Sequence, residues 1–312
     1  MDIYIEQSLE PADEAYLLDR LPDLSPRFGR ALTPAGRAAA VDGAEVIFGS
    51  PPADAIVASP SLRWLHLGSA GFNKYRGLAG QHLPFTITNS AGLFGTPVAE
   101  TAVAGILALL RGVPDFVRLQ DARTWEGAAT RPGLGKLTGS RVLILGQGSI
   151  GGTVRDILQG FGCRVALMGR SAPADFTTPA ELDARLPQAD IVVAALPETR
   201  ATIGLFDAAR LALMPAHCVF VNVGRGSLTD EDALRQMLLA GKLGGAVLDV
   251  TRHEPLPKDD PLWDTPRTLL TQHSAGGASD ENRLLVDRFL ENLARYRAGS
   301  ALLNRVDLAR GY

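Results

Sequence analysis

Three polar residues that lie far apart in the chain each follow an apolar, strand-like run. Arg225 lies in CVFVNVGRGSL, Glu254 in GGAVLDVTRHEPL and His273 in TLLTQHSAGG. If these runs are adjacent parallel strands, a cation, a carboxylate and an imidazole meet in one cleft, because ligands of open α/β sheets bind beyond the carboxyl ends of the strands. Reduction of a 2-keto acid needs such a set, since a hydride goes to C2, a proton goes to the oxygen and a cation polarises the carbonyl. The sequence therefore predicts an enzyme.

We expect each of the three residues to have its own role. His273 is the proton donor, and Glu254 would fix its tautomer and favour its protonated form. Arg225 can hold the substrate carboxylate and carbonyl in a fork that lysine cannot copy. Taken singly, Arg225 could be a turn residue between glycines and Glu254 a loop carboxylate before Pro255. The combination favours catalysis, and the neighbouring His253 should face away, because adjacent residues of an extended chain point in opposite directions.

A glycine-rich turn, LILGQGSIGG, indicates a dinucleotide site. Its cofactor-binding candidates are Gly146, Gly148, Ser149, Ile150 and Gly151. In GxGxxG the first glycine permits a tight turn, the second lets the backbone approach a pyrophosphate, and the third lets the helix pack on the strand. The helix N-terminus faces the anion. The alternative is a glycine-rich turn without a ligand, but a strand before, a helix after and the further strand RVALMG favour the dinucleotide.

The residues after that second strand indicate which dinucleotide is bound. An NAD enzyme needs an acidic residue about 20 positions after the glycines, where it binds the ribose diol. Here Arg170 stands 19 residues beyond Gly151, Ser171 adds a hydroxyl, and no acid occurs between Arg164 and Asp175. Because Arg170 can pair with a 2′-phosphate, we expect NADP as the preferred cofactor, with NAD possible. The alternative is a solvated arginine.

The composition of the chain narrows the class of protein. The 312 residues are 46% hydrophobic and 21% charged, with a net charge of −3. No apolar stretch is long enough for a membrane span, and no basic patch favours nucleic acid as a partner. The N-terminus shows no secretory signal, so we expect a cytoplasmic protein. Cys163 and Cys218 lack metal-ligand spacing, which predicts reduced core thiols and no metal site.

The pattern of apolar runs predicts an α/β protein with two Rossmann-like domains and parallel sheets. DIYIE, EVIFGS, LRWLHLGS and FTITNS predict a small flavodoxin-like sheet, and RVLILG, RVALMG, DIVVAAL, CVFVNVG, GGAVLDV and TLLTQH predict the dinucleotide-binding sheet. From Thr96 the chain is apolar nearly all round, which predicts a buried connecting helix. Helical periodicity over 279–296 predicts a return to the first domain. We therefore expect a discontinuous substrate domain, 1–94 plus 279–312, and a dinucleotide-binding domain, 95–278.

A carboxylate substrate also needs an anion-binding site. The segment LHLGSAGFNKY ends a strand in a turn of small residues, so the backbone N–H groups of Ser69, Ala70 and Gly71 could form an anion-binding nest for the substrate. The alternative is an ordinary strand-to-helix turn.

Four motifs in this order resemble the D-isomer-specific 2-hydroxyacid dehydrogenases. They are TPVAE at Thr96–Glu100, GQGSIG at Gly146–Gly151, VNVGRG at Val221–Gly226, and LDVTRHEPLPKDDPLW leading into TQHSAG. The resemblance covers the whole chain. Within the family, the chain is most similar to the short bacterial glyoxylate/hydroxypyruvate reductases of the A type, by its length and its C-terminal ending. Two positions depart from the family pattern: Gln272 stands where proline is usual, and Thr251 where an aromatic residue is common.

The resemblance implies further site residues and an assembly. The additional cofactor-binding residues are Thr96, Leu196, Pro197, Thr202, Val223, Asp249 and Gly276. Thr96 would reach the nicotinamide, although before Pro97 it also fits a helix N-cap. Asp249 with the Val223 carbonyl would hold the carboxamide, although Asp249 also fits a cap at a strand end. A homodimer through the nucleotide domain is implied, and the helix from Pro97 and the loop of Trp125 offer apolar surface for it.

These observations predict NADPH-dependent reduction of small 2-keto acids, with glyoxylate and hydroxypyruvate foremost, to D-2-hydroxy acids. The alternatives are a D-lactate-type, phosphoglycerate or phosphite dehydrogenase, and a non-enzymatic protein that senses NAD(P). A formate dehydrogenase of this fold would carry glutamine in place of Glu254.

Overall fold

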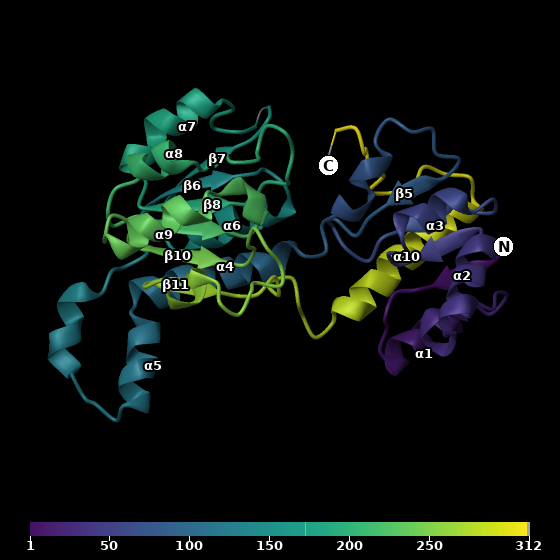
Figure 1. Cartoon of the computed structure of the whole chain (residues 1–312), viewed down its shortest axis with the longest axis horizontal. Coiled ribbons are helices and arrows are strands. Elements are labelled where there is room, and N and C mark those ends of the chain that lie inside the picture. The colour runs from purple at the N-terminus through teal and green to yellow at the C-terminus, as the bar shows by residue number, and fades with distance from the viewer. Residues whose placement is uncertain (172, 311–312) are drawn as a thin grey trace. The chain divides into compact units, whose positions relative to one another are not determined.

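The computed structural model describes residues 1–171 and 173–310, which form two compact units (Figure 1). The first unit joins Met1–Leu93 to Ala278–Tyr312, and the second unit is Phe94–Gly277. The boundaries expected from the sequence differ from these by one residue at each junction.

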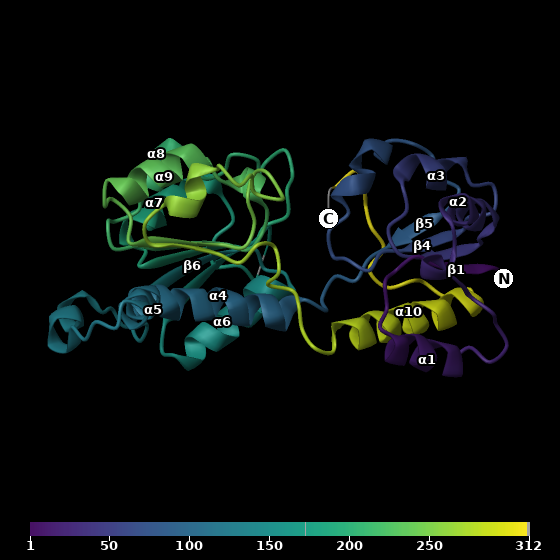
Figure 2. The same cartoon turned by 60° about the horizontal axis from the view of Figure 1, so that its bottom comes forward.

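The first unit is built on a five-stranded parallel sheet in the order β2-β1-β3-β4-β5. Its strands are β1 (Ile3–Ile5), β2 (Arg27–Phe28), β3 (Val46–Phe48), β4 (Trp64–His66) and β5 (Thr86–Thr88). Its helices are α1 (Pro11–Asp19), α2 (Pro34–Gly43), α3 (Ala53–Ala58) and α10 (Glu281–Arg297), with 3₁₀ turns at Gly29–Ala31 and Asn73–Leu78. This strand order is the flavodoxin-like one. Helices α1 and α10 lie on one face of the sheet, and α2 and α3 lie on the other (Figure 2).

Helix α10 completes the core of the first unit, as its periodicity predicted. The ring of Phe289 stacks on Phe48, with centroids 4.7 Å apart, and on Trp64, with centroids 5.4 Å apart. All three side chains are buried. Because α10 lies far along the chain from β3 and β4, these contacts make the first unit discontinuous.

The second unit is built on a six-stranded parallel sheet in the order β11-β10-β9-β8-β6-β7. Its strands are β6 (Arg141–Leu145), β7 (Arg164–Met168), β8 (Ile191–Ala194), β9 (Val219–Asn222), β10 (Gly245–Leu248) and β11 (Thr268–Leu270). Its helices are α4 (Gly95–Leu110), α5 (Val113–Asp121), α6 (Ser149–Gly160), α7 (Pro179–Arg185), α8 (Ala208–Leu213) and α9 (Glu231–Leu239), with 3₁₀ turns at Gly127–Gly133, Leu186–Gln188, Gly226–Leu228 and Pro261–Asp264. The predicted α/β class with two parallel sheets is confirmed.

Helices cover both faces of this second sheet (Figure 2). Helices α4 and α6 lie on one face, and α7, α8 and α9 lie on the other, so the strands read as continuous apolar runs. The chain winds from β6 to β7 in one direction and from β6 to β8 in the other. The carboxyl ends of β6 and β8 therefore flank the switch point at which ligands bind in such sheets.

Helix α4 is buried, as its apolar character predicted, but its N-cap lies two residues earlier than expected. The carbonyl of Phe94 accepts the first helical hydrogen bond, from Val98 N at 3.2 Å, so Phe94 is the N-cap and Thr96 lies inside the first turn. The N-cap expected at Thr96 is therefore wrong. A Cβ on Gly105 would lie 2.6 Å from Val247 Cγ1, so α4 packs closely on β10. Its apolar surface is thus largely covered within its own unit.

The sequence did not reveal α5. This helix and the 3₁₀ turn after it project from the second unit (Figure 1), and they leave Val113, Phe116 and Val117 exposed. Trp125 in the loop between them is 95% exposed. Four exposed apolar side chains of the unit are gathered here, whereas the sequence had placed part of the apolar surface on α4. No helix in 1–171 or 173–310 is long and apolar enough to cross a membrane.

Candidate active site

His273 and Glu254 form a hydrogen-bonded pair. Nδ1 of His273 lies 2.6 Å from Oε2 of Glu254, and both side chains are partly exposed. Strands β10 and β11 are in parallel register, with Leu248 opposite Leu270. The loops that carry the two residues therefore begin at the same edge of the sheet, which is how residues so far apart in sequence meet.

The loop of His273 has an unusual backbone, and Asp249 fixes it. Gln272 and His273 both have left-handed backbone conformations, with φ of 57° and 54°. His273 N donates to the carbonyl of Asp249 at 2.5 Å. Oδ1 of the buried Asp249 side chain accepts hydrogen bonds from Thr271 Oγ1 at 2.7 Å, and from the backbone N–H groups of Ser274 and Ala275 at 3.1 Å. Asp249 thus anchors the turn on which His273 is carried.

Glu254 lies at the end of a short loop that folds back on itself. Its Oε1 accepts a hydrogen bond from Thr251 N at 3.0 Å, while Thr251 Oγ1 donates to the carbonyl of His253 at 2.8 Å. One oxygen of the Glu254 carboxylate is thus held by its own loop and the other by His273.

The loop of Arg225 is held by Asn222, a residue that the sequence analysis missed. Asn222 ends β9 and its side chain is buried, with Nδ2 donating to the carbonyl of Arg225 at 2.9 Å and Oδ1 accepting from Gly224 N at 3.1 Å. The available signal was a single amide at the end of the apolar run CVFVN. Next along the chain, a Cβ on Gly226 would lie 2.0 Å from the carbonyl carbon of Thr251. The segment after Arg225 therefore packs directly against the loop that carries Glu254.

A hollow of about 230 Å³ adjoins the histidine pair. Glu254 and His273 line it together with Asp249, Thr251 and Trp263. His253 is not among its lining residues.

The glycine-rich turn has the shape that a pyrophosphate requires. Gly146 has φ of 117°, and a Cβ there would lie 2.6 Å from the carbonyl oxygen of Ala195. A Cβ on Gly151 would lie 1.8 Å from the carbonyl oxygen of Gly146, whereas one on Gly148 would meet no atom within 4 Å among the described residues. The second glycine therefore leaves open space before α6. The first N–H groups of that helix, at Ser149, Ile150 and Gly151, have no partner within the helix and are available to an anion.

The end of β7 carries Arg170 and Ser171, as expected from the sequence. The nearest following acid, Asp175, is engaged elsewhere, because its Oδ2 accepts a hydrogen bond from Leu167 N at 2.7 Å. Its carboxylate is bound to the backbone of β7, so it does not replace the missing acid of an NAD site.

The remaining cofactor candidates lie on loops and one helix of the second unit. Thr202 Oγ1 donates to the carbonyl of Pro197 at 2.7 Å, which closes the loop after β8. A Cβ on Gly224 would lie 2.5 Å from the carbonyl oxygen of Leu196, so the loops after β8 and β9 pack together beside Val223. Gly276 lies against the Phe94 ring at the start of α4, and Thr96 is exposed in the first turn of that helix.

The loop Ser69–Gly71 belongs to the first unit, where it follows β4. Its carbonyl groups are held, since Ser69 O accepts from Ser90 N at 3.0 Å and Ala70 O accepts from Asn89 Nδ2 at 2.7 Å. The backbone N–H groups of Ser69, Ala70 and Gly71 donate to no acceptor in the part of the chain that the structure describes. The loop thus has fixed carbonyls and free amides, as an anion-binding nest requires.

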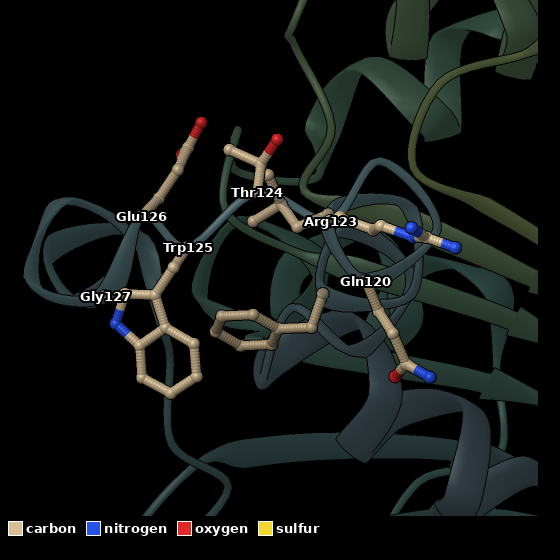
Figure 3. A pocket seen from close by; sticks show the side chains of 8 residues that line it. Gln120, Arg123, Thr124, Trp125, Glu126 and Gly127 are labelled. Carbon is tan, nitrogen blue, oxygen red and sulfur yellow. The ribbon is translucent and has the colours of Figure 1, made fainter.

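A larger hollow, of about 460 Å³, lies between α5 and the loop after it (Figure 3). It is lined by residues 116–127 of the projecting segment, including Phe116 and Trp125, and by none of the predicted catalytic residues. The described residues contain no cluster of three or more His, Cys, Asp or Glu side chains that could hold a metal ion. Cys163 and Cys218 are buried free thiols.

The family model described as "D-isomer specific 2-hydroxyacid dehydrogenase, NAD binding domain" matches residues 103–275. The chain belongs to this family. The resemblance drawn from the four motifs is thereby confirmed, and as a member of this family the protein is an NAD(P)-dependent oxidoreductase.

Some relatives are named as reductases of small 2-keto acids. An uncharacterised protein of Streptomyces coelicolor is 34% identical, over 88% of this chain and 98% of its own. Glyoxylate/hydroxypyruvate reductase A of Citrobacter koseri is 31% identical over 70% of each chain. The structure is similar to that of the NADPH-dependent glyoxylate/hydroxypyruvate reductase of Sinorhizobium meliloti, solved with NADP and sulfate, with a TM-score of 0.85, 27% identity, and coverage of 100% of this chain and 99% of that one.

Gln272 and Thr251, the two departures from the family pattern, each fit the local structure of this chain. The φ of 57° at Gln272 is closed to proline, whose ring holds φ near −65°. The hydroxyl of Thr251 makes a hydrogen bond to the carbonyl of His253 that an aromatic side chain at this position could not make. The backbones of the His273 loop and of the Glu254 loop in this dehydrogenase therefore involve residues that differ from the usual ones.

Proposed function

We propose that this dehydrogenase reduces small 2-keto acids, glyoxylate and hydroxypyruvate foremost, to D-2-hydroxy acids with NADPH. The observation that carries the proposal is the 2.6 Å contact between His273 Nδ1 and Glu254 Oε2 at the edge of the sheet where Arg225 also lies. The relatives named as glyoxylate/hydroxypyruvate reductases support the substrate class.

We propose a role for each catalytic candidate. The bound nicotinamide supplies a hydride to C2 of the keto acid. Because Glu254 occupies Nδ1 of His273, the ring has Nε2 left to donate a proton to the carbonyl oxygen as the hydride arrives. Arg225 would polarise that carbonyl and orient the carboxylate, since a guanidinium binds two oxygens in one plane. In the reverse direction His273 would take the proton back.

We propose that the dinucleotide occupies the turn from Gly146 to Gly151, with its pyrophosphate at the N-terminus of α6. The open space at Gly148 supports this position. NADP is the preferred form, because Arg170 and Ser171 stand where an NAD site has an acid and Asp175 is bound to β7. The other cofactor contacts, from Thr96, Leu196, Pro197, Thr202, Val223, Asp249 and Gly276, remain predictions. For the loop Ser69–Gly71 we propose a carboxylate-binding role, which its unpaired amides support.

We propose that the protein is a homodimer through its second unit. The projecting segment, α5 together with Trp125, is supported as the interface because a single chain leaves its apolar side chains Val113, Phe116, Val117 and Trp125 exposed. Figure 3 shows Trp125 in this segment. A second copy of the chain is the expected occupant, since oligomers of a single chain are most often two-fold dimers.

The proposed activity is tested by following NADPH oxidation with glyoxylate, hydroxypyruvate, pyruvate and 2-oxobutyrate, and by offering phosphite and 3-phosphoglycerate with NADP⁺. We expect the fastest turnover with glyoxylate or hydroxypyruvate. Phosphite or phosphoglycerate as the best substrate would refute the proposal. NADPH binding without turnover of any of them would also refute it and would favour a sensing protein.

A further inference from the structure

We infer that Glu231 is a positioning residue of the active site, because its carboxylate holds the loop that carries Glu254. The inference deepens the proposed function and rests on it for the meaning of the site. Glu231 lies six residues after Arg225, at the first position of α9, and no motif of the sequence analysis included it.

The carboxylate of Glu231 is buried and reaches across to the neighbouring loop. The residue is 8% exposed, and its Oε1 accepts a hydrogen bond from the backbone N–H of Arg252 at 2.5 Å. The N-cap of the helix is a different residue, Asp230, whose side chain accepts from Ala233 N. The Glu231 side chain is therefore not needed to cap its own helix.

The peptide that Glu231 binds belongs to the loop that presents the catalytic carboxylate. Thr251, the residue before Arg252, donates its N–H to Oε1 of Glu254. Gly226 packs against the same peptide, since a Cβ on it would lie 2.0 Å from the carbonyl carbon of Thr251. The segment from Gly226 to Glu231 thus contacts the loop at two residues, Thr251 and Arg252. It connects the loop of Arg225 to the loop of Glu254.

Burial of the charged Glu231 carboxylate is unfavourable in free energy. Burial raises the pKa of Glu231, opposed by the hydrogen bond from the Arg252 backbone and by the charge of Arg252, while Asp260 raises it further. Buried polar groups need partners, so removal of the carboxylate would leave the Arg252 N–H without an acceptor. The loop would then shift to find another, and hydride transfer is sensitive to displacements of about 1 Å, which can lower rates by about 100-fold.

The test compares variants of Glu231 with a matched control on the same helix turn. Glu231→Ala removes the acceptor. Glu231→Asp keeps the charge but is one methylene too short to reach Arg252 N. Glu231→Gln keeps an acceptor oxygen at the same distance. The control is Asp232→Ala, because Asp232 contacts only the exposed guanidinium of Arg252, at 3.5 Å, and exposed ion pairs contribute little.

Two measurements are made on each variant. Hydrogen exchange by mass spectrometry follows the peptide that contains residues 250–254, and steady-state kinetics separate kcat from the KM for NADPH. We expect Glu231→Ala and Glu231→Asp to exchange faster in this peptide and to lose kcat about 10- to 100-fold with KM for NADPH within about two-fold. Glu231→Gln should restore most of both properties, and Asp232→Ala should resemble the wild type.

The inference is overturned if exchange of residues 250–254 is unchanged in Glu231→Asp, or if Glu231→Gln is as impaired as Glu231→Ala. If Glu231→Ala does not fold, the Asp and Gln variants decide. The exchange readout needs no turnover, so the position of the loop is judged even if the wild-type protein reduces none of the keto acids. An absence of turnover in the wild-type protein would refute the proposed function but not the role of Glu231 in holding the loop.

Discussion

Oε2 of Glu254 contacts Nδ1 of His273, so the ring nitrogen on the opposite side, Nε2, is the one that can meet a substrate. We expect His273→Ala to lower kcat by about 10² to 10⁴-fold, because a positioned proton donor contributes about this much in the transition state. NADPH binding, measured by fluorescence titration, should be nearly unchanged. His253→Ala is the control, since His253 does not line the hollow beside the pair. Near-normal turnover of His273→Ala would assign the proton donor to another group.

Arg170 should determine the choice of cofactor. Replacement by aspartate would repel a 2′-phosphate and could bind a ribose diol, so Arg170→Asp should weaken the use of NADPH by about 1–3 kcal/mol and spare or improve that of NADH. The measurement is kcat/KM with each cofactor. Arg164→Asp makes the same charge change at the first residue of β7 and should affect neither cofactor. Equal losses with both cofactors in Arg170→Asp would make Arg170 a structural residue.

Gln272 should not tolerate the proline that is usual in the family. Its φ of 57° is unavailable to proline, so Gln272→Pro should force the His273 turn to rearrange and cost more than about 1 kcal/mol of stability, with a loss of kcat. Gln272→Gly, which adopts positive φ readily, should retain activity. Thermal unfolding and steady-state kinetics measure the two effects. A fully active, equally stable Gln272→Pro variant would contradict this prediction, because it would show that the turn accepts a negative φ at position 272 without loss of stability.

The stability of the first unit should fall as the pH is lowered below 6.5, because His66 is buried in its core. Burial, and then the charge of Arg288, lower the pKa of His66 from 6.5 to about 3. Its Nδ1 contacts Thr88 Oγ1 at 2.7 Å, while Nε2 has no partner among the described residues. The unfolded chain binds the proton more tightly between pH 6.5 and 3, so stability is lost in that window. Between pH 7.5 and pH 5 the loss from this residue is about 2 kcal/mol.

This loss is measured by urea unfolding followed through Trp64, which lies beside His66, in a background with Trp125→Phe and Trp263→Phe. His66→Gln, which cannot titrate, should show a flatter dependence of the unfolding free energy on pH. The same slope in both proteins would mean that other groups cause the acid sensitivity.

Trp125 should contribute to the proposed dimer. The side chain is almost fully exposed in one chain, and an exposed aromatic of this size commonly anchors an interface. We expect a dimer by light scattering at micromolar concentration, and a shift toward monomer for Trp125→Ser combined with Phe116→Ser. Leu239→Ser is the control, because Leu239 is an exposed apolar residue at the end of α9, outside the projecting segment. A wild-type monomer would contradict the proposal.

The buried strands of the fold were predictable from the sequence, because each is a continuous apolar run. The runs ending at Asn222, Leu248 and Leu270 are apolar throughout because helices cover both faces of their sheet, and this made them visible. Strand β2 has only two residues, too few to show a period, and α5 is a nine-residue helix that buries none of its side chains. The six strands of the second sheet were visible as apolar runs in the sequence, whereas short and exposed elements were not.

In the candidate site, the meeting of the candidate catalytic residues was predictable and the residues that hold their loops were not. His273 and Glu254 were found because imidazole and carboxylate after strands indicate chemistry. The anchoring roles of Asn222, Asp249 and Glu231 depend on hydrogen bonds to backbone groups of other loops. Such partners cannot be inferred from residue type or spacing, because any loop offers the same N–H and C=O groups.

The discontinuity of the first unit determines the order in which the protein can fold during synthesis. Phe48 and Trp64 are made early, but the ring that covers them, Phe289, belongs to a helix that is translated only after the whole of Phe94–Gly277. The second unit has all its strands in one continuous segment and can therefore fold on the ribosome first. Until α10 leaves the ribosome, the aromatic face of the earlier sheet stays uncovered, and a nascent chain stalled in the second unit would expose a surface that chaperones bind.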